Sequence, residues 1–183
     1  DYLRWSLRAA DDATRRVAYE DALGHLERAA HRLAPAAQVS PAAAMTELGV
    51  QLHRASLLQM TVGVGSDAVD QVCARARELL TLAGPDADIR HALWALGELA
   101  ANRAEYAICA DLAERLLRAG DDGSGLFAVA GEYLLGVVGY FTGRPVEGER
   151  RLTAAIDRLR AVDRGLLRRE VGRRPVLGCH NFR

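Results

Sequence analysis

Lysine is absent from this sequence, and all 24 residues counted as Lys or Arg are arginine. The absence excludes Schiff-base chemistry and other mechanisms that depend on a lysine amine. The basic residues are balanced by 24 acidic residues, so the formal net charge is zero. The protein therefore has no overall electrostatic attraction to nucleic acids or to anionic membranes.

Aromatic residues and cysteines are also few. Aromatic residues make up 5% of the sequence, whereas 50% is hydrophobic, so we expect a core built largely of Ala, Leu and Val. Cys73, Cys109 and Cys179 are odd in number and form no CxxC pair, which fits neither a disulfide framework nor a zinc site. This cysteine usage predicts a reducing, cytoplasmic location.

Long apolar runs are absent too. No stretch of about 18 apolar residues occurs, and residues 1–4 have neither a basic region nor an apolar region of the kind that begins a signal peptide. We therefore expect no export and no contact with a membrane. Because the sequence lacks an initial Met and ends on Cys179–Arg183, we expect it to be a fragment of a longer chain.

The apolar residues that are present recur at helical spacing, and no segment alternates as a strand does. This pattern predicts an all-α fold. The first clear helix is expected from about Thr14 to Leu33, ended by Pro35.

Two serines are expected to cap the helices that follow. Ser40 stands before Pro41, a favoured first helical residue, and Ser66 precedes another apolar stripe. Gly63 and Gly65 are expected to end the helix that Ser40 opens.

A repeat of 39 residues is visible in the second half of the chain. Leu96-Gly97 and Ala104–Tyr106 correspond to Leu135-Gly136 and Gly143–Pro145. Repeats of this length are typical of arrays of helical hairpins, so the sequence predicts an α-solenoid. The expected hairpins are residues 1–33, 41–83, 88–119 and 126–160, with 161–183 as the connection to a further repeat.

One segment carries a family resemblance. Val17-Ala18-Tyr19-Glu20-Asp21-Ala22-Leu23, followed by Leu26 and Ala29, resembles the second helix of a tetratricopeptide repeat. The resemblance implies a right-handed α-solenoid forming a single domain over residues 1–183. Cys109 and Gly148 stand where the repeat usually has Ala, and the second repeat has an extended turn.

A narrower resemblance concerns large bacterial regulators. Gly63–Ser66, Cys73–Leu79 and Leu112–Leu117 are similar to the repeat region of signal-transduction ATPases with numerous domains, which include Streptomyces antibiotic regulatory proteins and large LuxR-type activators. This resemblance implies a non-catalytic sensor or docking domain in a multidomain, ATP-dependent transcriptional regulator.

Patterns that carry catalysis or bind metals are weak. Residues 63–67 lack the strand and the GK[ST] ending of a phosphate loop, and residues 121–125 lack the ligand spacing of a calcium loop. The five histidines show no ligand spacing, and neighbouring Cys179 and His180 have no orienting third group. We therefore expect no enzyme activity, no metal and no cofactor.

Polar and aromatic residues at helical spacing predict a binding surface. In a tetratricopeptide array the first helix of each hairpin lines the concave face. The candidate groove residues are His91, Trp94, Glu98, Asn102, Tyr133, Tyr140 and Phe141. Aromatic side chains at such a surface suit the binding of a peptide or helix. The alternative for Trp94 and Phe141 is that they pack between hairpins.

The end of the sequence is basic. Arg150, Arg151, Arg158, Arg160, Arg164, Arg168, Arg169, Arg173 and Arg174 outnumber Asp157, Asp163 and Glu170 there. No aromatic residue accompanies them, which disfavours direct contact with nucleic acid. Pairing with acidic residues of a neighbouring domain is the preferred interpretation.

Two functions of different classes remain as alternatives to the regulator. One is a free-standing adaptor that assembles proteins, and the other is an all-α enzyme with a site between hairpins. The expected partner is a protein or peptide, or the ATPase core of the same polypeptide; a small-molecule effector is a further candidate.

Overall fold

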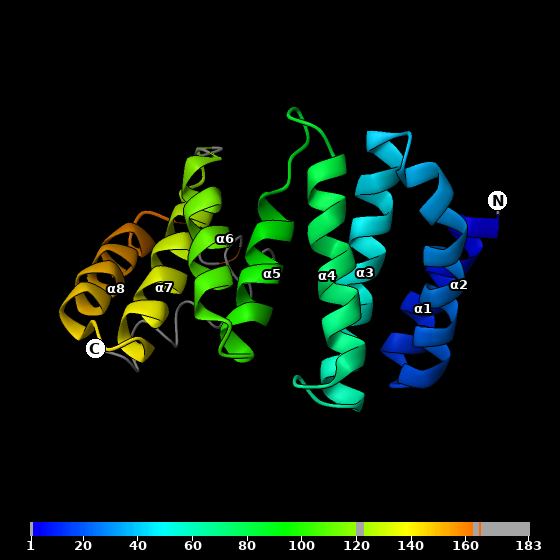
Figure 1. Ribbon diagram of the computed structural model, residues 1–183, viewed down its shortest axis with the longest axis horizontal. Helices are drawn as coiled ribbons and strands as arrows, with labels where there is room; N and C mark the ends of the chain where they lie inside the picture. Colours follow the sequence, from blue (N-terminus) through cyan, green and yellow to red (C-terminus); the bar gives the residue numbers. More distant parts are fainter. Residues whose placement is uncertain (1, 120–122, 163–164, 166–183) are drawn as a thin grey trace. The chain divides into compact units, whose positions relative to one another are not determined.

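The computed structural model describes residues 2–119, 123–162 and 165 (Figure 1). Eight α-helices and no strand occur in these ranges, which confirms the all-α prediction. Contacts divide the chain into two compact units, Asp1–Ala92 and Leu93–Arg183. The helices are α1 (Tyr2–Arg15), α2 (Tyr19–Ala37), α3 (Pro41–Thr61), α4 (Asp67–Leu82), α5 (Arg90–Asn102), α6 (Tyr106–Arg118), α7 (Leu126–Phe141) and α8 (Pro145–Leu159).

In the first unit each helix packs against the next one along the chain. α1 packs on α2, α2 on α3, and α3 on α4. Small residues allow this close packing: Ala10, Ala22 and Ala29 are completely buried beside Leu26 and Leu57. The expected core of Ala and Leu is therefore observed.

The predicted helix from Thr14 to Leu33 was wrong at both ends. The chain leaves the helical conformation after Arg15, where Val17 has a positive φ of 62°, and a new helix begins at Tyr19. Pro35 does not end α2, which continues to Ala37. Proline has no amide hydrogen and so costs α2 one hydrogen bond in its last turn, but this loss does not end the helix.

The two predicted serine caps are confirmed. The Ala43 amide donates to the Ser40 hydroxyl at 3.3 Å, with Pro41 as the first residue of α3. The Val69 amide donates to the Ser66 hydroxyl at 3.4 Å at the start of α4. Gly63, with φ of 90°, lies in the turn between these helices, so residues 63–66 belong to a hairpin turn and Asp67 begins α4.

Three hairpin turns share one hydrogen-bond pattern. The amides of Ala18, Glu105 and Arg144 each donate to the carbonyl five residues earlier, at 2.9, 2.9 and 2.8 Å. The residue just before each donor has a positive φ: 62° at Val17, 57° at Ala104 and 75° at Gly143. This is the Schellman arrangement, which satisfies the last carbonyl groups of a helix and reverses the chain. The last two turns are separated by the 39-residue spacing seen in the sequence.

Glycines set the helix distances in the second unit, where α6 and α7 pack together and α7 packs on α8. A Cβ added at Gly136 would lie 2.6 Å from the Leu152 side chain, and one at Gly148 would lie 2.9 Å from the Gly136 carbonyl oxygen. A Cβ added at Gly97 of α5 would lie 2.6 Å from Leu134 of α7. The repeated Leu-Gly pair is therefore a site of close approach between helices.

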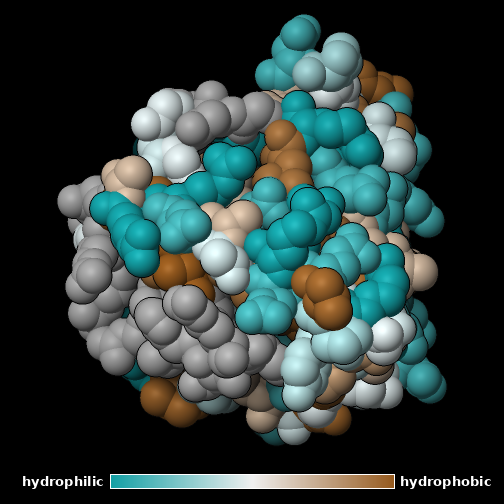
Figure 2. Space-filling model, turned by 90° about the vertical axis from the view of Figure 1, so that its left-hand side faces the viewer, coloured by the Kyte–Doolittle hydropathy of each residue, from teal (hydrophilic) through white to brown (hydrophobic). Residues whose placement is uncertain are grey.

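Exposed hydrophobic side chains are separate from one another on the face shown in Figure 2. The brown, hydrophobic side chains there form small spots among hydrophilic ones. Within the described ranges, no helix is both long and apolar enough to cross a membrane.

Candidate functional site

The second unit contains a pocket of about 340 Å³ between the first helices of its two hairpins. We call it the aromatic pocket. Three rings contribute to its wall: Tyr106 at the start of α6, and Tyr133 and Phe141 of α7. Its full lining is Glu98, Ala101, Asn102, Ala104, Tyr106, Tyr133, Leu134, Val137 and Phe141.

Two helices supply most of the lining. Asn102 of α5 and Phe141 of α7 stand 39 residues apart, one repeat of the sequence, and both line the pocket. Trp94 and Tyr133 have the same spacing, but only Tyr133 is part of the lining. The turn that ends α5 then brings Tyr106 to the same place.

The rings are arranged around the end of α7. Phe141 stacks on Tyr106, with centroids 5.7 Å apart and planes within 4° of parallel. Tyr140 meets Phe141 edge to face at 5.4 Å. Tyr140 is 50% exposed and Phe141 52% exposed, so the aromatic surface reaches solvent beside the pocket.

Four of the seven predicted groove residues line this pocket: Glu98, Asn102, Tyr133 and Phe141. Tyr140 is adjacent through its contact with Phe141. Trp94 is only 5% exposed and its ring lies 6.2 Å from that of Tyr133, so it supports the wall from within the core. This is the packing role considered as its alternative. His91 is exposed on the first turn of α5 and belongs to the first unit.

Tyr106 was not among the predicted groove residues. It begins a second helix rather than lying on a first one, so the helical spacing used for the prediction excludes it. The signal that could have found it is its place in the repeat, directly after the hairpin turn.

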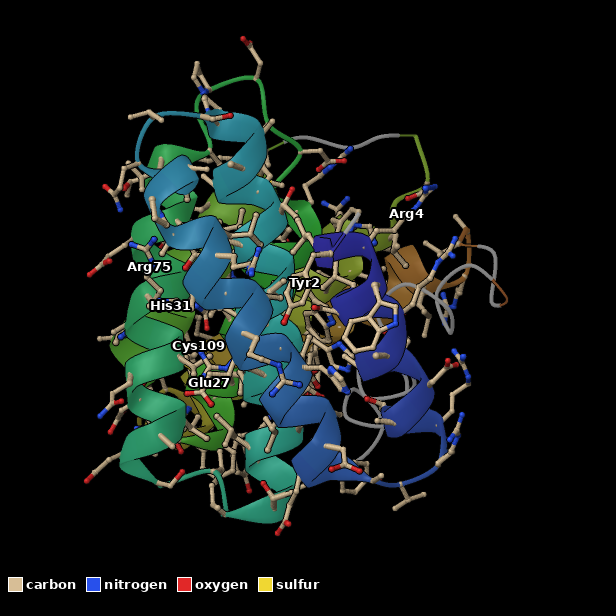
Figure 3. All side chains as sticks on the ribbon, turned by 90° about the vertical axis from the view of Figure 1, so that its right-hand side faces the viewer. Tyr2, Arg4, Glu27, His31, Arg75 and Cys109 are labelled. Carbon is tan, nitrogen blue, oxygen red and sulfur yellow. The ribbon has the colours of Figure 1, made fainter. Side chains whose placement is uncertain are left out.

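The first unit has a pocket of about 470 Å³, which we call the polar pocket. Glu27 of α2 and Arg75 of α4, both labelled in Figure 3, lie on its wall, together with Arg54 of α3. Its full lining is Leu23, Glu27, Gln51, Arg54, Leu58, Ala68, Gln71, Val72 and Arg75. The sequence analysis did not identify it.

A hydrogen-bonded network lies behind the polar pocket. Arg75 donates to both carboxylate oxygens of Glu47, from Nε at 2.8 Å and from Nη2 at 2.7 Å. Gln51 donates to Glu47 at 3.2 Å and accepts from Arg54 at 2.9 Å. The hydrogen bond with Glu47 raises the pKa of Arg75 above its ordinary value, although partial burial opposes the shift.

In the sequence, the sign of this network is a pair of polar residues within an apolar stripe. Glu47 and Gln51 occupy buried positions of α3, between Ala44, Leu48 and Ala55. A buried charge needs a partner, but the stripe alone does not say that Arg75 supplies it.

Aromatic rings of α1 lie against basic side chains of α2. The Arg32 guanidinium is 4.1 Å from the centre of the Tyr2 ring, and Trp5 meets His25 edge to face at 5.3 Å. Trp5 is 57% exposed. The Tyr2 ring lies within cation–π distance of Arg32, and Trp5 stays largely exposed beside it.

Neither a reactive thiol at Cys109 nor a cluster of metal ligands is found in the part of the chain that the structure describes. Cys109 is buried, and burial raises the pKa of its thiol to about 12, so it stays protonated at neutral pH. Among the same residues, no group of three or more His, Cys, Asp or Glu is arranged to hold a metal ion.

Several predicted features lie outside the described residues. They include Cys179, His180, the acidic pair at positions 121 and 122, and the arginines at 164, 168, 169, 173 and 174. Of the basic residues that are described, Arg151 donates to Glu132 of α7 at 3.1 Å, and Arg160 pairs with Asp157.

Known protein families, curated proteins and solved structures were all compared with this chain, and none matches it.

Proposed function

We propose that this chain is a non-catalytic docking module built from tetratricopeptide-like hairpins, and that the aromatic pocket receives a segment of a partner protein. The observation that carries the proposal is the meeting of Tyr106, Tyr133 and Phe141 around one open pocket. Large, stiff rings give contact area at a low cost in side-chain entropy, which is why they dominate the energetics of interfaces.

The geometry of the hairpin turns supports the proposal that the hairpins are tetratricopeptide-like. Three turns share one hydrogen-bond pattern, and small residues follow them at corresponding places: Ala22, Cys109 and Gly148 each donate an amide to the carbonyl four residues earlier. Such regularity is expected of stacked hairpins of one kind. A right-handed superhelix is the arrangement that the tetratricopeptide resemblance implies.

The larger context is part of the same proposal. We propose, from the resemblance to large bacterial regulators, that this module is a sensor or docking domain of a cytoplasmic, multidomain, ATP-dependent transcriptional regulator. The bound segment would then favour one conformation of the module, and the ATPase core would respond to that change. In a free-standing adaptor the same pocket would assemble protein complexes without an ATPase.

A peptide selection tests the docking function. The full chain is immobilised, peptides are selected from an unbiased display library, and their affinities are measured by fluorescence anisotropy. Phe141→Ala removes an exposed ring of the pocket, so we expect affinity to fall at least about tenfold while the melting temperature stays nearly constant. The matched control is Val146→Ala, which truncates an 81% exposed side chain of the same unit. The proposal would be contradicted if the selected peptides bound Phe141→Ala as tightly as they bind Val146→Ala and the unaltered chain.

A further inference from the structure

Two exposed aromatic rings of α1 are joined by contacts to basic side chains of α2. Tyr2 is 39% exposed and Trp5 57% exposed, and their ring centroids are 6.1 Å apart. The Arg32 guanidinium lies 4.1 Å from the centre of the Tyr2 ring, and the Trp5 ring meets His25 edge to face. Nη2 of Arg28 lies 3.0 Å from Nδ1 of His25. These contacts make one continuous surface across the two helices.

Four exposed arginines belong to this surface, in two pairs. Arg8 follows Trp5 by three residues on α1 and Arg4 by four, so each of these side chains lies beside Arg8 on the helix. The other two arginines stand four residues apart on α2. We call the whole set the Arg–Trp surface, and Figure 3 labels two of its members, Tyr2 and Arg4; it consists of Tyr2, Arg4, Trp5, Arg8, Arg28 and Arg32.

The positive charge of the Arg–Trp surface is not neutralised by nearby acids. Within the described parts of the chain, none of its four arginines is paired with a carboxylate. Acidic residues of α1 begin only at Asp11, and Asp12 pairs with Arg15. Glu27 of α2 lies on the wall of the polar pocket instead, 3.8 Å from Arg54. A partner therefore meets a local excess of positive charge.

The composition of the surface is that of a protein interface. Tyr, Trp and Arg are the residue types that most often carry the binding energy of such interfaces. Guanidinium groups also suit carboxylates, because their planar fork can donate two parallel hydrogen bonds to one carboxylate.

The overall charge favours a short anionic partner over a long one. The chain is neutral, so everything outside the four arginines carries an excess of four negative charges. A nucleic acid gains affinity from the number of phosphates that it places on basic residues, and beyond this surface its phosphates would meet that negative excess. A short acidic segment needs only the local charge.

We propose that the Arg–Trp surface docks a short acidic segment of a partner protein. The carboxylates of the segment pair with the four arginines, and an apolar side chain of the segment packs on the rings of Tyr2 and Trp5. This surface shares no residue with the aromatic pocket, so the proposal does not depend on the docking function of that pocket.

Two labelled peptides test the charge of the partner. The acidic probe is fluorescein-Gly-Glu-Glu-Leu-Glu-Glu-Phe-Glu-Glu, and the neutral probe has Gln in place of every Glu. Each is titrated with the full chain and followed by fluorescence anisotropy. The acidic probe should bind at least about tenfold more tightly than the neutral one, and its affinity should fall between about 50 mM and about 300 mM NaCl because salt screens exposed charges.

Three variants locate the binding. Trp5→Ala should weaken the acidic probe at least about tenfold, as expected for a central aromatic residue. Arg8→Gln should weaken it about two- to fivefold, the contribution of one exposed ion pair, without lowering the melting temperature. The matched control is Arg77→Gln on α4, which removes an arginine that has no carboxylate partner among the described residues and lies outside the surface, so affinity should stay unchanged.

Three results would overturn the proposal. The first is equal affinity for the two probes, or no binding of the acidic probe up to about 1 mM. The second is affinity for the acidic probe that is the same in Arg8→Gln and Trp5→Ala as in Arg77→Gln. The third is displacement of the acidic probe by a thymidylate decamer at a lower concentration than by the unlabelled acidic peptide, which would assign the surface to single-stranded nucleic acid.

Discussion

At the scale of single residues, the ion pair between Glu47 and Arg75 holds a nearly buried carboxylate in the first unit. The Glu47 side chain is 1% exposed and that of Arg75 is 22% exposed. Removing such a charge from water is costly, and the two hydrogen bonds from the guanidinium offset that cost. The pKa of Arg75 is raised because folding stabilises its charged form. Arg75 therefore stays protonated at neutral pH and well above it.

Arg75→Met should therefore destabilise the protein by about 3–5 kcal/mol, because Glu47 remains buried without its partner. The matched control is Arg118→Met, whose pair with Glu114 is exposed and should contribute less than about 1 kcal/mol. Both free energies of unfolding can be measured by urea denaturation. A loss below about 1 kcal/mol for Arg75→Met would show that Glu47 finds water or another partner.

The residue scale is also where the sequence was least informative. Helical spacing identified Trp94 and Phe141 equally well as aromatic side chains on first helices. Their surroundings differ, however: Trp94 is buried beside Tyr133, whereas Phe141 lies at the exposed end of α7. Burial depends on the neighbouring helices, which periodicity within one helix does not describe. Arg75, the partner of Glu47, lies 28 residues further along the chain on another helix, so periodicity could not identify it either.

At the scale of elements, the hairpin turns store a small amount of strain. Val17 is β-branched and has a φ of 62°, a conformation that costs an ordinary residue about 1–2 kcal/mol. At the corresponding place in the last hairpin the residue is Gly143, which adopts such a φ without that cost.

Val17→Gly should stabilise the protein by about 0.5–1 kcal/mol, because relief of strain exceeds the entropy that glycine loses on folding. Val17 is 65% exposed, so little packing is lost. The same substitution at Val146, within α8, should instead destabilise by about 0.5–1 kcal/mol. Thermal unfolding of the two variants would give shifts of opposite sign, and a loss of stability for both would contradict this account of the turn.

The sequence predicted the helices and their boundaries better than it predicted the contacts of single residues. Ser40, Ser66 and the turn glycines are local signals, so the boundaries that they set at α3 and α4 were found correctly. The break at Val17 has no such signal, because valine does not favour a positive φ, and the start of α2 was consequently missed. The 39-residue repeat predicted helical hairpins at matching places, and the turns at Glu105 and Arg144 share one hydrogen-bond pattern.

At the scale of the whole molecule, each of the two units contains one of the two pockets described above. The aromatic pocket belongs to Leu93–Arg183, and the polar pocket to Asp1–Ala92. The sequence indicated the first through its tyrosines and phenylalanine but not the second, whose arginines look like an ordinary solvated surface. The two pockets give the proposed docking function a clear alternative location within the same chain.

Hydrogen exchange of the full chain, with and without a peptide selected from the library, tests the central claim most directly. The account predicts slower exchange in residues 98–106 and 133–141, and unchanged exchange in α2 and α4. Slower exchange confined to α2, α3 and α4, around the polar pocket, would contradict it. So would protection confined to α1, where Trp5 is exposed.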